Sequence, residues 1–214
     1  MIDDIEKGQE HRGPWMQTAS GGRFWPLDPR HEDIHIDDIA NGLAQCGRYN
    51  GQRQIDKYYS VAEHSVLMTQ YAMEHFQHWP PSAYLACLMH DAPEAYINDL
   101  NRAMKKAMRI GARGGRSEYD TLNYCVERAI NTKFRINEVA ALYADGIKDL
   151  DQRIVQNEKE AFMNTGGHEW AFDVFEPLPG VDIECWDAPK AKKEFLSCYW
   201  SLELRRKQEE GYDE

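Results

Sequence analysis

Residues Tyr84–Glu94 read YLACLMHDAPE, and this stretch decides how the chain is interpreted. The part up to Met89 is strongly apolar, which predicts a buried helical segment. His90 and Asp91 follow directly, and an imidazole beside a carboxylate suits a divalent transition metal. Glu94 comes four residues after His90, a spacing that places it on the same helix face, beside such a metal. A carboxylate in that place could handle protons for a metal-bound water.

The rest of the chain has the apolar periodicity of helices rather than the alternation of strands. Ser60 and Glu63 form a capping-box pattern that opens one of these helices. Strand signals are sparse, and no Asn-Gly turn separates two alternating runs. We therefore predict an all-α fold of the helical-bundle type. The expected helices span residues 37–47, 60–76, 99–108, 118–132, 137–163 and 189–209.

Two segments lack this periodicity. Residues 1–33 are punctuated by glycine and proline, so we expect an irregular N-terminal arm, pinned to the body by Trp15, Phe24 and Trp25. Residues 166–189 mix glycine, proline and aromatic side chains, which favours an irregular excursion. A chain of 214 residues suits one domain. We expect residues 34–214 to form a single body that ends in a C-terminal helix.

Composition limits the class of partner. The net charge is -11 and the pI about 5.2, which makes the chain a poor general binder of nucleic acid or of an anionic membrane. Phosphate groups would have to be held by a few placed cations or by a metal. The five cysteines form no C-x-x-C pair. Neither a signal peptide nor an apolar run of membrane-spanning length is visible, so we expect a cytoplasmic protein.

Two residues cannot complete a metal site, so further donors are expected on other helices. His64 lies just inside the helix that Ser60 caps, and Asp151 lies within the long helix predicted over residues 137–163. Lys148, three residues before Asp151, and Glu158, seven after it, share a helix face with that aspartate.

The order of a histidine, a His-Asp pair and a distant aspartate resembles the HD superfamily of metal-dependent phosphohydrolases. The chain is similar to single-domain HD proteins that include bacterial 5′-deoxynucleotidases and phage dATP triphosphohydrolases. Each motif alone is weak, whereas their occurrence in order at compatible distances is specific. The resemblance covers roughly residues 34–163, and its matching segments are residues 38–40, 47–51, 59–65, 90–94, 98–100 and 148–158.

This resemblance implies one divalent transition metal, which is Zn, Mn, Co or Fe. The implied catalytic residues are Glu94, as the acid/base, and Asp91, which also holds the ion. No histidine lies between Ala92 and Gly167, whereas binuclear HD phosphodiesterases use extra histidines before the last aspartate. One tight catalytic metal is therefore expected rather than two. The implied metal ligands are His64, His90, Asp91 and Asp151.

The resemblance also implies contacts with the substrate. Arg48 would grip phosphate, and Tyr49 occupies a place where close relatives carry Trp and could stack on the base, which leaves base preference open. Asp99 either contacts the sugar and the reacting phosphate or caps the helix that follows it. Lys105 and Lys148 match lysines that contact phosphates.

Two reactions fit these residues equally well on motifs. One releases phosphate from a deoxynucleoside monophosphate, and the other releases triphosphate from a dNTP, with Mg accompanying that substrate. The pair of Lys105 and Lys148 favours the longer phosphate chain. Lys106 is adjacent to Lys105, so a register shift of one residue could exchange the roles of these two lysines. The expected partner is a small-molecule deoxynucleotide, with no nucleic acid and no membrane, and we expect a homo-oligomer.

Two rival interpretations belong to other classes of protein. A catalytically silent HD scaffold could bind a nucleotide as a sensor, but such a scaffold need not keep a full ligand set and Glu94. A nucleic-acid-binding module is disfavoured by the charge of -11 and by the lack of a basic stripe.

Overall fold

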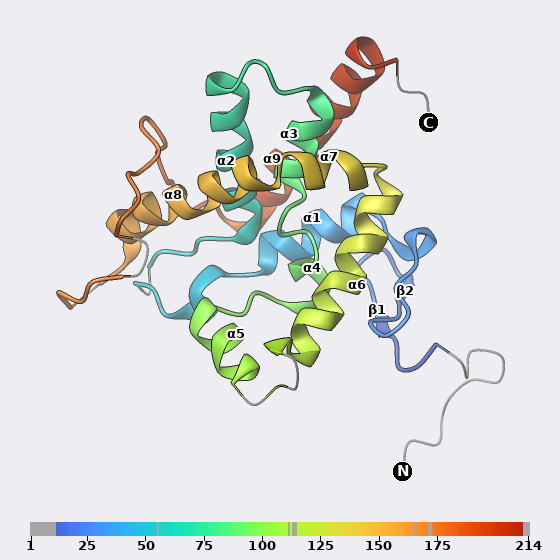
Figure 1. Cartoon of the computed structure of the whole chain (residues 1–214), viewed down its shortest axis with the longest axis horizontal. Coiled ribbons are helices and arrows are strands. Elements are labelled where there is room, and N and C mark those ends of the chain that lie inside the picture. The colour runs from blue at the N-terminus through green and yellow to red at the C-terminus, as the bar shows by residue number, and fades with distance from the viewer. Residues whose placement is uncertain are drawn as a thin grey trace.

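The computed structural model describes residues 12–54, 56–110, 112, 115–164, 166–170 and 173–211. Within these ranges the fold is all-α, as predicted, because the strands pair over only two residues each. Figure 1 shows the arrangement of the helices. Their bounds are α1 Ile36–Gln45, α2 Val61–His75, α3 Pro81–Leu88, α4 Glu94–Ile97, α5 Arg102–Arg109, α6 Glu118–Lys133, α7 Asn137–Leu142, α8 Ala144–Phe162 and α9 Ala188–Glu209, with short 3-10 helices η1 His31–Asp33 and η2 Arg48–Gly51.

The C-terminal helix α9 lies at the centre of the packing. It contacts α1, α2 and α3, while α2 also packs against α3 and α8. Figure 1 shows α8 crossing α2, with α5 and α6 side by side farther down the molecule. Burial of apolar surface among these helices is the main favourable contribution to folding. Fully buried core side chains include Val66, Leu85, Leu88, Ile130, Ile154, Phe195 and Leu202.

Helix α2 begins as predicted at Ser60, whose hydroxyl accepts the backbone N–H of Glu63 at 3.1 Å. The other half of the predicted capping box, in which the Glu63 side chain bonds back to the Ser60 backbone N–H, is wrong. The buried carboxylate of Glu63 instead accepts the backbone N–H groups of Glu184, Cys185 and Trp186, at 2.6–3.1 Å. The irregular segment before α9 is thereby fastened to the first turn of α2.

The His-Asp pair lies in a turn and not on a helix. Helix α3 ends at Leu88 and α4 begins at Glu94, so Glu94 belongs to a different helix from the one that precedes His90. A close approach between α1 and α4 fixes this turn. A β-carbon added to Gly42 of α1 would lie 2.7 Å from the backbone oxygen of Ala95, so only glycine fits there.

The long helix predicted over residues 137–163 is divided at Tyr143 into α7 and α8. Trp79 accounts for the break, because its ring meets that of Tyr143 edge-on with centroids 5.0 Å apart. A β-carbon on Gly146 would lie 2.7 Å from the same indole ring. Asp151 therefore lies in the second turn of α8 rather than deep within one long helix.

The N-terminal arm is more ordered than expected where it is described. Strands β1 Met16–Gln17 and β2 Arg23–Phe24 form an antiparallel pair. Phe24 and Trp25 are buried as predicted, and Phe24 stacks on Tyr96 with centroids 4.1 Å apart. Trp15 is 43 % exposed, so its predicted burial is wrong. Residues 1–11 of the arm lie outside the described residues.

No helix in the described part of the chain combines the length and the apolar character that crossing a lipid bilayer would require.

Candidate metal and phosphate site

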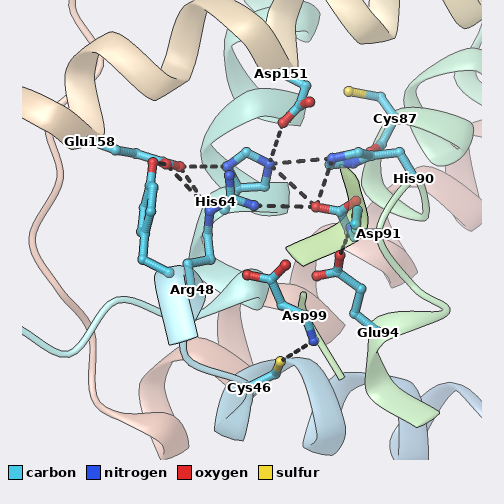
Figure 2. A network of polar contacts seen from close by, with 12 residues as sticks. Cys46, Arg48, His64, Cys87, His90, Asp91, Glu94, Asp99, Asp151 and Glu158 are labelled. Atoms are coloured by element: carbon cyan, nitrogen blue, oxygen red, sulfur yellow. Dashed lines mark hydrogen bonds and ion pairs between the residues drawn. The ribbon is translucent and has the colours of Figure 1, made fainter. Parts of the chain in front are cut away.

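Four side chains predicted as metal ligands converge on one point, as Figure 2 shows. His64 comes from the first turn of α2, His90 and Asp91 from the turn after α3, and Asp151 from α8. One donor atom from each side chain lies within 4.8 Å of the others. Among the described residues, no other group of three or more such side chains converges in this way.

The spacing of these donor atoms suits a metal ion. His64 Nε2 lies 3.3 Å from His90 Nε2 and 3.3 Å from Asp151 Oδ1. Asp91 Oδ2 lies 3.2 Å from His90 Nε2 and 3.7 Å from His64 Nε2. Ligands about 2.1 Å from a tetrahedral ion are separated by about 3.4 Å, so the donor set fits an ion of this kind.

Hydrogen bonds set the orientation of both imidazoles. The Nδ1 atom of His64 donates to the carboxylate of Glu158 at 2.7 Å, and that of His90 donates to the backbone oxygen of Cys87 at 2.8 Å. Burial raises the pKa of Glu158, but the Arg48 and His64 charges outweigh it and lower the pKa, so the carboxylate can only accept. With Nδ1 as the donor, each ring directs its Nε2 atom toward the same point, and an unprotonated Nε2 would direct its lone pair there. Two facing lone pairs require a shared cation or a proton.

The charges around this point also favour a bound cation or proton. Burial opposes a positive charge on His90, but in the absence of an ion Asp91 and Asp151 raise its pKa to about 9. Burial also penalises the Asp91 carboxylate, yet His90, His64 and Arg48 together lower its pKa. The cluster is built to hold a positive charge, which a divalent ion supplies better than one proton.

Glu158 belongs to the same cluster, although the sequence alone did not reveal its contacts. It is completely buried and accepts from His64, from Arg48 Nε and from the hydroxyl of Tyr49. Its position seven residues after Asp151, on the same face of α8, was the available signal. In the folded chain its carboxylate orients the imidazole of His64, a predicted metal ligand.

Arg48 and Tyr49 lie beside the cluster in η2. Arg48 Nη1 is 3.3 Å from Asp91 Oδ2, and Arg48 Nε is 3.2 Å from Glu158 Oε1, so the guanidinium bridges a predicted metal ligand and its supporting carboxylate. Tyr49 has a φ of 62°, in the left-handed region that a tyrosine rarely adopts. Its hydroxyl is bonded to Glu158, which holds the ring in a fixed place.

Glu94 is buried at the edge of the cluster, with a relative exposure of 6 %. Its Oε1 atom is 3.3 Å from Lys105 Nζ, while Oε2 has no hydrogen-bond partner among the described residues. Burial, Asp91 and Asp99 raise the pKa of Glu94 well above its ordinary value, against the opposing effect of Lys105. Such a carboxyl group can carry a proton near neutral pH.

The remaining predicted substrate contacts are brought to the same place. Asp99 lies near the cluster, but Asn101 caps α5 through a bond from the Met104 N–H, so Asp99 does not cap that helix. Lys105 lines the hollow from α5, whereas Lys106 is exposed and is not among the lining residues. Lys148 faces the cluster from α8.

A hollow of about 300 Å³ opens over the two predicted carboxylate ligands. Its wall holds four cations and four carboxylates, so a divalent ion would make it net positive despite the acidity of the whole chain. Several other lining residues were not predicted from the sequence. The lining comprises Arg48, Tyr49, Asp91, Glu94, Asp99, Leu100, Asn101, Arg102, Lys105, Lys148, Asp151, Gln152, Val155 and Trp170.

Comparison with known proteins identifies relatives without a stated activity. No family model matches the chain. An uncharacterized protein of Rhodobacter capsulatus is 42% identical over 97 residues, which cover 45% of this chain and 50% of that protein. The uncharacterized protein YfdR of Escherichia coli K12 is 26% identical over 169 residues, 79% of this chain and 83% of that one. The chain thus spans half the length of the Rhodobacter relative, and neither name specifies a ligand.

Proposed function

We propose that the protein is a metal-dependent phosphohydrolase that acts on deoxynucleotides, either monophosphates or triphosphates. The observation that carries the proposal is the pair of imidazole Nε2 atoms 3.3 Å apart, each with its Nδ1 bonded to an acceptor. With Asp91 and Asp151 they form a set of two nitrogen and two oxygen donors. The resemblance of the motif order to HD-domain phosphohydrolases supports the same function.

A divalent ion held by His64, His90, Asp91 and Asp151 would supply Lewis acidity. It would also lower the pKa of a bound water molecule, so that this water could act as a nucleophile at neutral pH. The hollow above the predicted carboxylate ligands provides access for a substrate. An active site of this kind needs positive charge near the phosphoryl oxygens, since negative charge accumulates there during hydrolysis.

The protein's own side chains meet that need. Arg48 lies against Asp91 with a planar fork of donors suited to phosphate oxygens. Lys148 and Lys105 line the hollow from two different helices, α8 and α5, so they could hold successive phosphates. Glu94 can exchange a proton at Oε2, the oxygen without a partner in the described structure. These residues bind, orient and protonate, and both chain lengths remain compatible with them.

The test combines metal content with turnover. The purified protein should contain or take up one transition-metal ion per chain, measured by elemental analysis. Loaded with Zn, Mn, Co or Fe, it should then release phosphate or triphosphate from members of a panel of dNMPs and dNTPs, resolved by chromatography. Failure to bind any ion would overturn the proposal. Nucleotide binding without turnover would instead favour the silent scaffold.

One variant separates catalysis from metal binding. Glu94→Gln keeps the size of the side chain but removes its proton exchange, so turnover should fall by about 10²- to 10⁴-fold while the metal content stays at wild type. Glu160→Gln makes the same chemical change at an exposed position of α8 and should leave both unchanged. Full activity of Glu94→Gln would contradict the assignment of Glu94 as the acid/base.

A further inference from the structure

The hollow has two chemically different halves. One half carries the charged groups that suit a metal ion and phosphate. The uncharged lining residues are Leu100, Asn101, Tyr49, Gln152, Val155 and Trp170. Four of them are called the uncharged half: Tyr49 and Trp170, whose rings adjoin, and Gln152 and Val155 of α8. None of these four residues has a charge with which to bind phosphate. This half of the hollow therefore suits an uncharged part of the ligand.

Helix α8 relates the two halves in space. Asp151, Gln152 and Val155 all line the hollow from this helix. Because an α-helix rises about 1.5 Å per residue, Val155 lies about 6 Å beyond Asp151 along the helix. A phosphate bound beside Asp151 would therefore place a sugar next to it and a base over the uncharged half.

The aromatic rings in this half are held in place. The backbone N–H of Trp170 donates to Asp173 Oδ2 at 2.7 Å, and Lys159 Nζ lies 5.6 Å from the centre of the Trp170 ring. Lys159 and Asp173 are themselves paired at 2.5 Å. Tyr49 is fixed by its bond to the buried Glu158. These rings therefore form a prepared surface rather than loose side chains.

The spacing of the rings decides which way a base can bind. The centroids of Tyr49 and Trp170 are 5.9 Å apart and the planes are inclined by 47°, so the two rings already touch. A base cannot slip between them and must lie against their open side. Trp170, which is partly exposed to the hollow, offers the larger stacking face.

We propose that Trp170, with Val155 and Gln152, forms the nucleobase subsite of this hollow. Trp170 supplies stacking, Val155 supplies apolar contact, and the Gln152 amide offers a donor and an acceptor to the edge of the base. This assignment rests on the proposed function, since it takes the phosphate end of the ligand to lie at the metal cluster. It adds Trp170 as a specificity-determining residue, from a segment that lies outside the motifs shared with HD-domain proteins.

The experiment compares substrates with and without a base. Wild type, Trp170→Ala and Trp170→Phe are assayed, metal-loaded, on the best deoxynucleotide and on the matching 2-deoxyribose 5-phosphate or 5-triphosphate. Loss of one stacked base corresponds to about a tenfold rise in KM for the nucleotide. We expect that rise in Trp170→Ala, with kcat nearly kept, no change for the base-free substrate, and partial recovery in Trp170→Phe. Trp200→Ala removes an exposed tryptophan of α9 and should change neither substrate.

The outcomes distinguish this inference from the proposed function. Equal losses on both substrates, or no loss on either, would overturn the base subsite while leaving hydrolysis intact. If wild type cleaves none of the substrates, the proposed function fails. The base subsite can then be tested separately, by calorimetric titration of the metal-loaded protein with deoxynucleosides. Binding that disappears in Trp170→Ala supports it, whereas the absence of nucleoside binding to wild type overturns it.

Discussion

At the scale of single residues, the buried carboxylate of Glu158 connects the predicted metal ligand His64 to Arg48 and Tyr49, the predicted substrate contacts. It accepts from His64, Arg48 and Tyr49, so the tautomer of a predicted metal ligand and the placement of a guanidinium depend on one side chain. A sequence pattern could place Glu158 on the face of Asp151 but could not show what it meets, because its partners come from η2 and α2. The convergence of His64, His90, Asp91 and Asp151 was predictable because their order along the chain is itself the motif.

Replacing Glu158 by Gln should weaken metal binding by about 10- to 100-fold, the usual cost of losing a carboxylate that supports a metal-binding histidine. The amide keeps the shape of the side chain but loses the charge that orients His64 and Arg48. The measurement is the dissociation constant for Zn or Co in competition with a chelator. Asp149→Asn, an acid-to-amide change on the exposed face of the same helix, should leave it unchanged. Wild-type affinity in Glu158→Gln would contradict the supporting role.

Metal binding should also depend on pH in a defined direction. In the absence of an ion, Asp91 and Asp151 raise the pKa of His90 to about 9 against the effect of burial, so His90 carries a proton below that pH. An incoming ion must displace this proton, and affinity should therefore rise with pH, by up to about tenfold per unit, until it levels off near pH 9. Calorimetry in buffers of different ionisation enthalpy should detect about one proton released. Affinity that is flat between pH 6.5 and 8.5 would rule this out.

At the scale of elements, helix placement followed from periodicity, while the breaks between helices followed from distant partners. The division at Tyr143 depends on Trp79, and the second half of the capping box was lost because Glu63 bonds to residues 184–186. Trp170 belongs to the segment without periodicity, so no sequence pattern pointed to it. Such features depend on contacts between residues far apart in the chain, which local patterns do not contain.

The contact between α1 and α4 gives the prediction at this scale. Gly42→Ala places a methyl group 2.7 Å from the Ala95 oxygen and should push α4, with Glu94 at its start, away from the cluster. We expect a loss of about 1–3 kcal/mol in the free energy of unfolding, typical of overpacking, measured by urea denaturation, with lower turnover. Asn41→Ala, at the neighbouring position of α1, should cost little, because alanine favours helix. Stability of Gly42→Ala at or above wild type would show that α4 yields easily.

At the scale of the whole molecule, the cluster ties together parts of the chain that are far apart in sequence. Its ligands come from α2, from the turn between α3 and α4, and from α8, and α9 packs against α1, α2 and α3 behind them. An ion bound at this point would therefore act as a cross-link of the folded state. It brings together two negative carboxylates and two imidazole lone pairs that otherwise depend on protons for compensation.

Removing the metal should accordingly destabilise the entire fold. A ligand at 1,000 times its dissociation constant adds about 4 kcal/mol to the folded state, which corresponds to a rise in Tm of about 10 °C for a chain of this size. Thermal unfolding followed by circular dichroism, after chelation and again after reloading with Zn or Co, measures this shift. Asp151→Asn removes one ligand at a partly exposed position and should abolish most of the shift while still folding. An equal shift in wild type and in Asp151→Asn would mean that the stabilising ion binds elsewhere, and the cluster would then lose its role as the metal centre.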